Sequence, residues 1–192
     1  GRNLNDWVDV AGFLSGKFRV ILVDLPGFGG TSYPQEEILG IFDYAEFVSR
    51  FLKKLNIDKP TVLGHSLGGR IGIILGARHG LLKKLILVDA AGVEERSLII
   101  KVQIAVYKFF KALLPDLFVS VLRAKMGSKE YVQSGKLSGT FSQVVEQNLK
   151  HLLPKIKVPT LIIWGENDEV VHIKNAELMR SRIPHSRVRV IW

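Results

Sequence analysis

Short apolar runs recur along the chain and predict strands that are buried on both faces. The runs are Arg19–Val23, Thr61–Gly64, Lys84–Asp89, Thr160–Trp164 and Arg187–Trp192. A strand with one face in water carries a polar residue at every second position, and most of these runs do not. The pattern therefore favours a mostly parallel sheet over a solvent-facing antiparallel one.

Segments with helical periodicity separate several of these runs. Apolar residues over Tyr44–Leu55 line one helical face, and Asp43 with Glu46 predicts a capping box at the start of that helix. A glycine-rich helix is expected over Leu67–His79, and another near Ile173–Ile183. Strands that alternate with such helices predict an α/β fold, with a mostly parallel sheet and helices on both of its faces.

The alternation stops after the third strand, where a long stretch predicts only helix and loop. We expect a small helical cap, inserted over one edge of the sheet. The expected division is a first part of the core over residues 1–92, the cap over residues 93–157, and a last, incomplete part of the core over residues 158–192.

The most specific motif lies between a predicted strand and a predicted helix. It reads Gly64, His65, Ser66, Leu67, Gly68, Gly69. The pattern G-x-S-x-G in this context is typical of a nucleophile elbow, where a strained backbone exposes the serine hydroxyl. Side chains at Gly64 and Gly68 would clash with the neighbouring strand and helix, and the helix start would offer the Leu67 N–H to an oxyanion. An accidental glycine turn is the alternative, and the flanking elements argue against it.

Several segments together resemble the α/β-hydrolase family, in the group with a cap in the later half of the sheet. They are Asp24–Gly30, Gly64–Gly69, Leu87–Gly92 and Val158–Asp168, in family order. The resemblance implies a hydrolase with Ser66 as nucleophile and Asp168 as the acid of a catalytic triad. Asp89 is the alternate acid position, a helix-capping role is the alternative for Asp168, and Asp24 is expected to order its turn.

The resemblance also implies a histidine base on a loop after the last strand, but the sequence stops on that strand. The histidines present are interpreted as structural or surface residues: His65, His79, His151, His172 and His185. Gly1 resembles the tail of an oxyanion loop. We therefore expect a sequence cut at both ends, which is nearly inactive by itself because it lacks the base.

Composition limits the chemistry further. The chain has no cysteine, which excludes disulfides, thiolate zinc sites and a cysteine nucleophile. No histidine pair has metal-ligand spacing, and the G-x-G-x-x-G nucleotide pattern is missing, so we expect neither a metal nor another cofactor. The net charge of +9 suits anionic partners. No aromatic-interleaved basic motif supports nucleic-acid binding.

Most of this positive charge falls in the expected cap. There, Leu98–Leu114 carries Lys101, Lys108 and Lys111 on one side and apolar residues elsewhere. We favour a helix that roofs a pocket, and the alternative is weak contact with an anionic membrane surface. No apolar run reaches the roughly 18–20 residues of a membrane span, and no signal peptide is visible, so we expect a cytoplasmic protein.

The expected function is hydrolysis by acyl transfer, on a carboxylic ester of a small or medium apolar substrate. Hydrolysis of a carbon–carbon bond in ring-fission products is an alternative, because relatives with that activity share the strand end seen at Leu87–Gly92. A non-catalytic binding domain of the same fold is the other alternative, should the protein end at Trp192.

Overall fold

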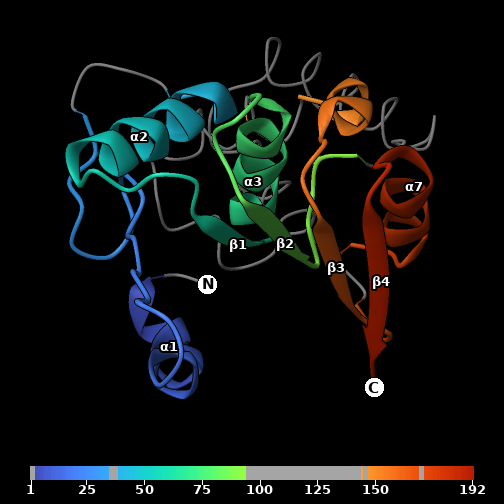
Figure 1. Ribbon diagram of the computed structural model, residues 1–192, viewed down its shortest axis with the longest axis horizontal. Helices are drawn as coiled ribbons and strands as arrows, with labels where there is room; N and C mark the ends of the chain where they lie inside the picture. Colours follow the sequence, from blue (N-terminus) through green and yellow to red (C-terminus); the bar gives the residue numbers. More distant parts are fainter. Residues whose placement is uncertain (1–2, 35–38, 94–143, 145–146, 169–170) are drawn as a thin grey trace, which may run out of the picture.

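The computed structural model describes residues 3–34, 39–93, 144, 147–168 and 171–192. These residues form a parallel sheet with helices packed against it (Figure 1). The elements are η1 (Leu4–Trp7), α1 (Val8–Ser15), α2 (Ile41–Lys54), β1 (Thr61–His65), α3 (Leu67–Ala77), β2 (Lys84–Val88), η2 (Lys150–Lys155), β3 (Thr160–Gly165), α7 (Lys174–Arg182) and β4 (Ser186–Ile191), where η denotes a 3₁₀ helix.

The strands of the described sheet all run parallel, in the order β1-β2-β3-β4. The register pairs Gly64 of β1 with Leu87 of β2, and Val88 of β2 with Ile163 of β3. Because every strand points the same way, their carboxyl ends meet at one edge of the sheet. The predicted parallel arrangement is confirmed, and these strands lie close to their predicted bounds.

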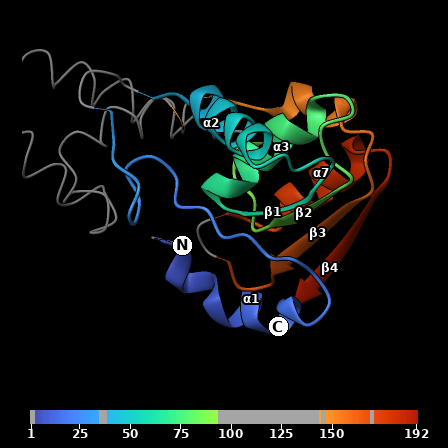
Figure 2. The same ribbon diagram turned by 60° about the vertical axis from the view of Figure 1, so that its left-hand side comes forward.

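Helices lie on both sides of the sheet, as the apolar pattern predicts. On one face, α3 packs against β1 and β2, and α7 packs against β3 and β4. Both α2 and η2 pack on α3. Figure 2 shows α1 on the other side of the sheet from these helices.

The core lies between the central strands and the helices on the face that carries α3 and α7. Its largest fully buried side chains include Trp164, Tyr44, Ile73, Leu85, Leu87 and Ile162. Burial of one such side chain contributes about 1.5–3 kcal/mol. The Tyr44 hydroxyl donates a hydrogen bond to the Pro26 carbonyl at 3.1 Å, and burial raises the pKa of Tyr44 to about 12.

Glycines on α3 allow this helix to lie close to the sheet. A Cβ atom on Gly72 would lie 3.0 Å from Cδ1 of Leu85, and one on Gly76 would lie 3.0 Å from Cδ2 of the same leucine. Contacts this short leave no room for a larger residue without movement of the neighbours. The middle and the last turn of α3 are therefore held close to β2.

One strand prediction is wrong for the described residues. Arg19–Val23 is not assigned as a strand, and no described segment pairs with it. Ile21 in this segment is 37% exposed, as is Leu63 on the outer strand β1. A strand needs a neighbour to accept and donate its backbone hydrogen bonds, and an apolar pattern does not supply that neighbour.

The capping box is also placed differently from its prediction. Helix α2 begins at Ile41, with Gly40 as its N-cap, and Asp43 is the third helical residue. The Asp43 carboxylate accepts a hydrogen bond from the Gly40 N–H at 2.7 Å. Glu46 lies further along the helix and forms ion pairs with Arg50 and Arg78.

Most of the expected cap lies outside the described residues, including the predicted helix Leu98–Leu114. The division into residues 1–92, 93–157 and 158–192 therefore stays a prediction. The described part of residues 93–157 includes η2, and Val144 is also helical. None of the described helices is long and apolar enough to cross a membrane.

Candidate active site

Ser66 stands at the corner between β1 and α3, in a strained backbone conformation. Its φ of 50° and ψ of −109° lie in a region that residues with a side chain seldom adopt. The Ser66 N–H donates to the Val88 carbonyl at 3.2 Å, and the Ser66 carbonyl accepts from the Arg70 N–H at 3.2 Å. The predicted strand–turn–helix context of the motif is confirmed.

The glycines around Ser66 differ in how closely other atoms approach them. A Cβ atom on Gly64 would lie 2.2 Å from the Gly68 carbonyl oxygen, as expected of a crowded corner. A Cβ atom on Gly68 would meet no described atom within 4 Å, so the predicted clash at Gly68 is wrong. The crowded position is Gly69, where the added atom would lie 2.4 Å from Cβ of Ala90. The reason is that Gly69, and not Gly68, faces the chain leaving β2.

Leu67 is the first residue of α3. The first N–H groups of a helix have no acceptor within the helix, and the helix dipole places partial positive charge there. The Leu67 N–H therefore belongs to a group of donors that can stabilise an anion formed beside Ser66.

Two carboxylates follow β2 and β3, the next two strands of the sheet after β1. Asp89 comes directly after β2 and its Oδ1 accepts from the Gly165 N–H at 2.8 Å. Asp168 comes shortly after β3 and its Oδ1 accepts from the Val171 N–H at 2.9 Å. Both carboxylates act electrostatically on His65. The sheet thus gathers Ser66, Asp89 and Asp168 at its carboxyl edge, which the spacing in the sequence does not show.

His65 lies beside the elbow and packs against Trp7. The two ring centroids are 6.1 Å apart, and the rings are tilted by 59°. Burial lowers the pKa of His65, and the charges of Asp89 and Asp168 oppose that shift. The result is an imidazole that favours its neutral form, held by ring packing as the sequence interpretation expects of a structural histidine.

The other histidines are exposed: His79, His151, His172 and His185. The Nδ1 atom of His172 accepts a hydrogen bond from the Lys174 N–H at 3.1 Å, just before α7. The His185 carbonyl accepts from the Thr160 N–H at 2.9 Å. These positions agree with the interpretation of the four as surface residues.

Asp24 orders the glycine-rich turn, as predicted. Its Oδ2 accepts from the Gly30 N–H at 3.0 Å and its Oδ1 accepts from the Leu4 N–H at 2.8 Å. A Cβ atom on Gly29 would overlap the Asp24 carboxylate. The carboxylate therefore holds the turn against the start of η1 and has a structural role.

Sequence reasoning missed Arg70, which lies one turn after Ser66. Its side chain is buried, and its Nη1 atom donates to the carbonyls of Val144 at 2.8 Å and Gln147 at 2.9 Å. The available signal was its position, because Arg70 is the one charged residue in the apolar, glycine-rich helix α3. A charge in such a helix requires buried partners.

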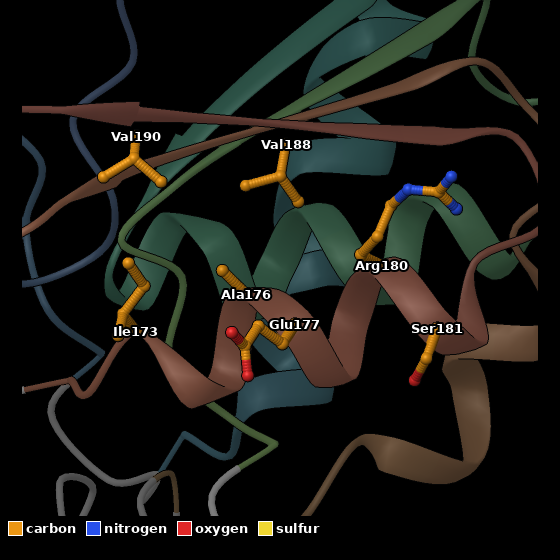
Figure 3. Close-up of a pocket in the computed structure, with 7 residues that line it drawn as sticks. All are labelled: Ile173, Ala176, Glu177, Arg180, Ser181, Val188 and Val190. Carbon is orange, nitrogen blue, oxygen red and sulfur yellow. The ribbon is translucent and has the colours of Figure 1, made fainter.

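A pocket of about 350 Å³ lies elsewhere, between α7 and β4 (Figure 3). Its lining includes Ile173, Ala176, Val188 and Val190. It is at the sheet edge opposite β1, so it does not belong to the site around Ser66. Among the described residues, no three histidine, aspartate or glutamate side chains are grouped so that they could hold a metal ion.

Comparison with known proteins gives consistent matches. The family model described as alpha/beta hydrolase fold matches residues 1–129. The chain is 25% identical to a lipase of Moraxella sp. over 98% of its own length and 66% of that protein. It is 24% identical to a monoacylglycerol lipase of Mus musculus, over 96% of its own length and 64% of that protein. It thus spans just under two thirds of the length of these curated relatives.

Solved structures agree with this result. A bacterial membrane phospholipase A superposes with a TM-score of 0.79 at 27% identity, over 100% of this chain and 68% of that one. An esterase from Exiguobacterium antarcticum gives a TM-score of 0.73 at 24% identity, over 100% of this chain and 80% of that one. With the elbow at Ser66 and the parallel sheet that carries it, the family model identifies this chain as a member of the alpha/beta hydrolase fold family.

Proposed function

We propose that this chain forms the catalytic core of a serine hydrolase that cleaves carboxylic esters by acyl transfer. The observation that carries the proposal is the strained Ser66 between β1 and α3, with the Leu67 N–H beside it. Backbone strain at a polar residue is commonly retained where that residue performs chemistry. The carboxylates at the same sheet edge supply the acid that such a serine requires.

The proposed roles follow from these positions. The Ser66 Oγ atom attacks the ester carbonyl, and the Leu67 N–H stabilises the oxyanion of the tetrahedral intermediate. Asp168 orients a histidine that takes the serine proton and gives it to the leaving alcohol. That histidine is proposed to follow β4, and none of the five histidines in this chain is assigned as the base.

The substrate class is proposed from the relatives. The lipase and monoacylglycerol lipase matched above act on lipid esters by their names, and both matches cover nearly all of this chain. These names support ester cleavage, and we propose a carboxylic ester of a small or medium apolar substrate. A meta-cleavage product hydrolase superposes with a TM-score of 0.70 at 20% identity, which shows a shared fold alone. Ester cleavage is accordingly preferred over carbon–carbon cleavage.

The first test measures turnover of p-nitrophenyl esters, from acetate to palmitate, by the full-length protein and its Ser66→Ala variant. We expect measurable turnover by the parent, with kcat lower by at least about a thousandfold in the variant. Circular dichroism checks that the variant folds. Turnover that survives Ser66→Ala would contradict the proposal. A parent without activity on any ester would favour the carbon–carbon or binding-domain alternative.

A second test separates the two candidate acids. Asp168→Asn and Asp89→Asn form a matched pair, because each carboxamide keeps an oxygen that can accept the same backbone N–H. Both variants lose the negative charge and exchange the other carboxylate oxygen for an NH2 donor, so the two changes are chemically equal. We expect kcat to fall by about 10³–10⁴-fold in Asp168→Asn and by less than about tenfold in Asp89→Asn. The reverse order would assign the acid to Asp89.

A further inference from the structure

Arg70 brings together two parts of the chain that are far apart in the sequence. Its side chain is 4% exposed, and Nη1 donates to the carbonyls of Val144 and Gln147. A buried guanidinium is stable only when its N–H groups find acceptors, and backbone carbonyls supply them here. The side chain therefore binds α3 to the segment that precedes η2.

The same side chain also packs on the chain that leaves β2. Gly92 has a φ of +110°, and a Cβ atom there would lie 2.9 Å from Cγ and 3.4 Å from Nη1 of Arg70. The Gly92 carbonyl accepts from the Leu149 N–H at 2.7 Å. Gly92 is thus held between the Arg70 side chain and Leu149, and all three are buried.

These contacts reach Ser66 through its backbone. The Ser66 carbonyl accepts from the Arg70 N–H at 3.2 Å and from the Ala91 N–H at 3.4 Å. Ala91 directly precedes Gly92, so packing of the Arg70 side chain beside Gly92 restricts where Ala91 can lie relative to the corner. A strained residue keeps its conformation only where its surroundings restrict it from several sides.

We propose that Arg70 is a positioning residue, whose side chain joins Gly92 to Val144 and Gln147 and thereby holds Ser66 in its reactive conformation. This role rests on the function proposed above, because it concerns the same serine. In this role Arg70 touches neither the substrate nor the reacting atoms. Its effect passes through Gly92 and Ala91 to the backbone of Ser66.

The test uses Arg70→Met in the full-length protein, with Arg70→Lys as the conservative variant. Methionine fills much of the space but leaves both carbonyls without their donor, whereas a lysine ammonium can still donate to them. We expect kcat for a p-nitrophenyl ester to fall about tenfold or more in Arg70→Met, with KM changed less than about threefold. Arg70→Lys should recover most of this loss.

Arg78→Met is the matched control, because Arg78 ends the same helix and donates to Glu46 at 3.1 Å and Ser49 at 2.6 Å. It removes an equal charge at the C-cap of α3, and Arg78 is not among the nearest neighbours of Gly92. We expect it to lower stability slightly and leave kcat unchanged. Equal kcat losses in Arg70→Met and Arg78→Met would overturn the positioning role and leave Arg70 a general stabiliser.

Amide hydrogen exchange supplies a readout that does not depend on turnover. The Leu149 N–H, which donates to Gly92, should exchange at least about tenfold faster in Arg70→Met and close to the parental rate in Arg70→Lys. Unchanged exchange of Leu149 in folded Arg70→Met overturns the proposal. If Arg70→Met does not fold, the result depends on Arg70→Lys. Near-parental kcat together with near-parental exchange of the Leu149 N–H supports the positioning role. Near-parental exchange with a large loss of kcat overturns it. A failure of the ester hydrolase proposal would appear separately, as turnover that survives Ser66→Ala.

Discussion

At the scale of single residues, the elbow shows which parts of a motif carry the geometry. Gly64 and Gly69 are fixed by close backbone or Cβ contacts, whereas Gly68 meets nothing nearby. The motif in the sequence identifies Ser66 because it names the strained position itself. It wrongly predicts a clash at Gly68, because the clash depends on which side of the helix faces the chain after β2. Arg70 was missed for the same reason, since both of its carbonyl partners lie more than 70 residues further along the chain.

The pKa of His65 leads to a prediction about pH and stability. Burial lowers this pKa in the folded chain, while the unfolded chain keeps the ordinary value of about 6.5. As the pH falls below about 6.5, the unfolded chain binds the proton first, so the free energy of unfolding decreases. We expect urea unfolding to show a smaller loss of stability between about pH 7 and pH 5 in His65→Asn than in the parent.

The exposed His185 provides the control for this measurement. It lies on the surface in the folded chain, so His185→Asn makes the same substitution away from the elbow. If His65→Asn has the same slope as the parent, burial of His65 does not contribute to acid sensitivity.

At the scale of elements, an apolar run forms a strand where an adjacent strand is present to share its backbone hydrogen bonds. The runs that became β1 to β4 were predicted from their apolar pattern, because burial on both faces imposes that pattern. Arg19–Val23 has the same pattern without a hydrogen-bonded neighbour among the described residues, so the apolar pattern alone wrongly predicted a strand there. Helix α2 was predicted as an element, but its first turn was not. Gly40 serves as the cap because Asp43 accepts its N–H.

The close packing of α3 on β2 gives a prediction at this scale. Gly76 lies so near Leu85 that a valine there would push the helix away from the sheet. We expect Gly76→Val to lower the free energy of unfolding by about 1–3 kcal/mol, measured by urea denaturation. Gly12→Val in α1 is the control, because a Cβ atom there meets no described atom within 4 Å. A loss in Gly12→Val as large as in Gly76→Val would show that the effect comes from helix propensity and not from packing.

At the scale of the whole molecule, parallel topology explains why the candidate acids lie near the candidate nucleophile. Ser66, Asp89 and Asp168 follow β1, β2 and β3, and these strands are adjacent and point the same way. Three positions spread over about a hundred residues therefore meet at one edge. The net charge of +9 is also a property of the whole molecule, because its field acts over the surface and not at a single contact.

The charge leads to a prediction about anionic surfaces. We expect the chain to bind anionic phospholipid vesicles weakly and neutral vesicles less, with binding lost as salt rises from about 0.05 M to 0.5 M. Sedimentation with vesicles measures this. If the alternative membrane contact of Leu98–Leu114 is made, the triple variant with Lys101, Lys108 and Lys111 changed to Gln binds less than a variant with the same change at Lys53, Lys54 and Lys84. Equal weakening by the two variants would assign the binding to net charge alone.

The sequence by itself determined the four paired strands, the helices α2, α3 and α7, and the place of Ser66 at the corner between β1 and α3. Burial on both faces requires apolar strands, and the crowded corner around Ser66 requires glycine at Gly64 and Gly69, so both leave a local trace in the chain. Only the tertiary structure decided which backbone groups hold Asp89 and Asp168, which glycine is crowded and what Arg70 binds. These depend on contacts between distant segments, and the energy of such contacts is set by packing and burial that no local pattern records.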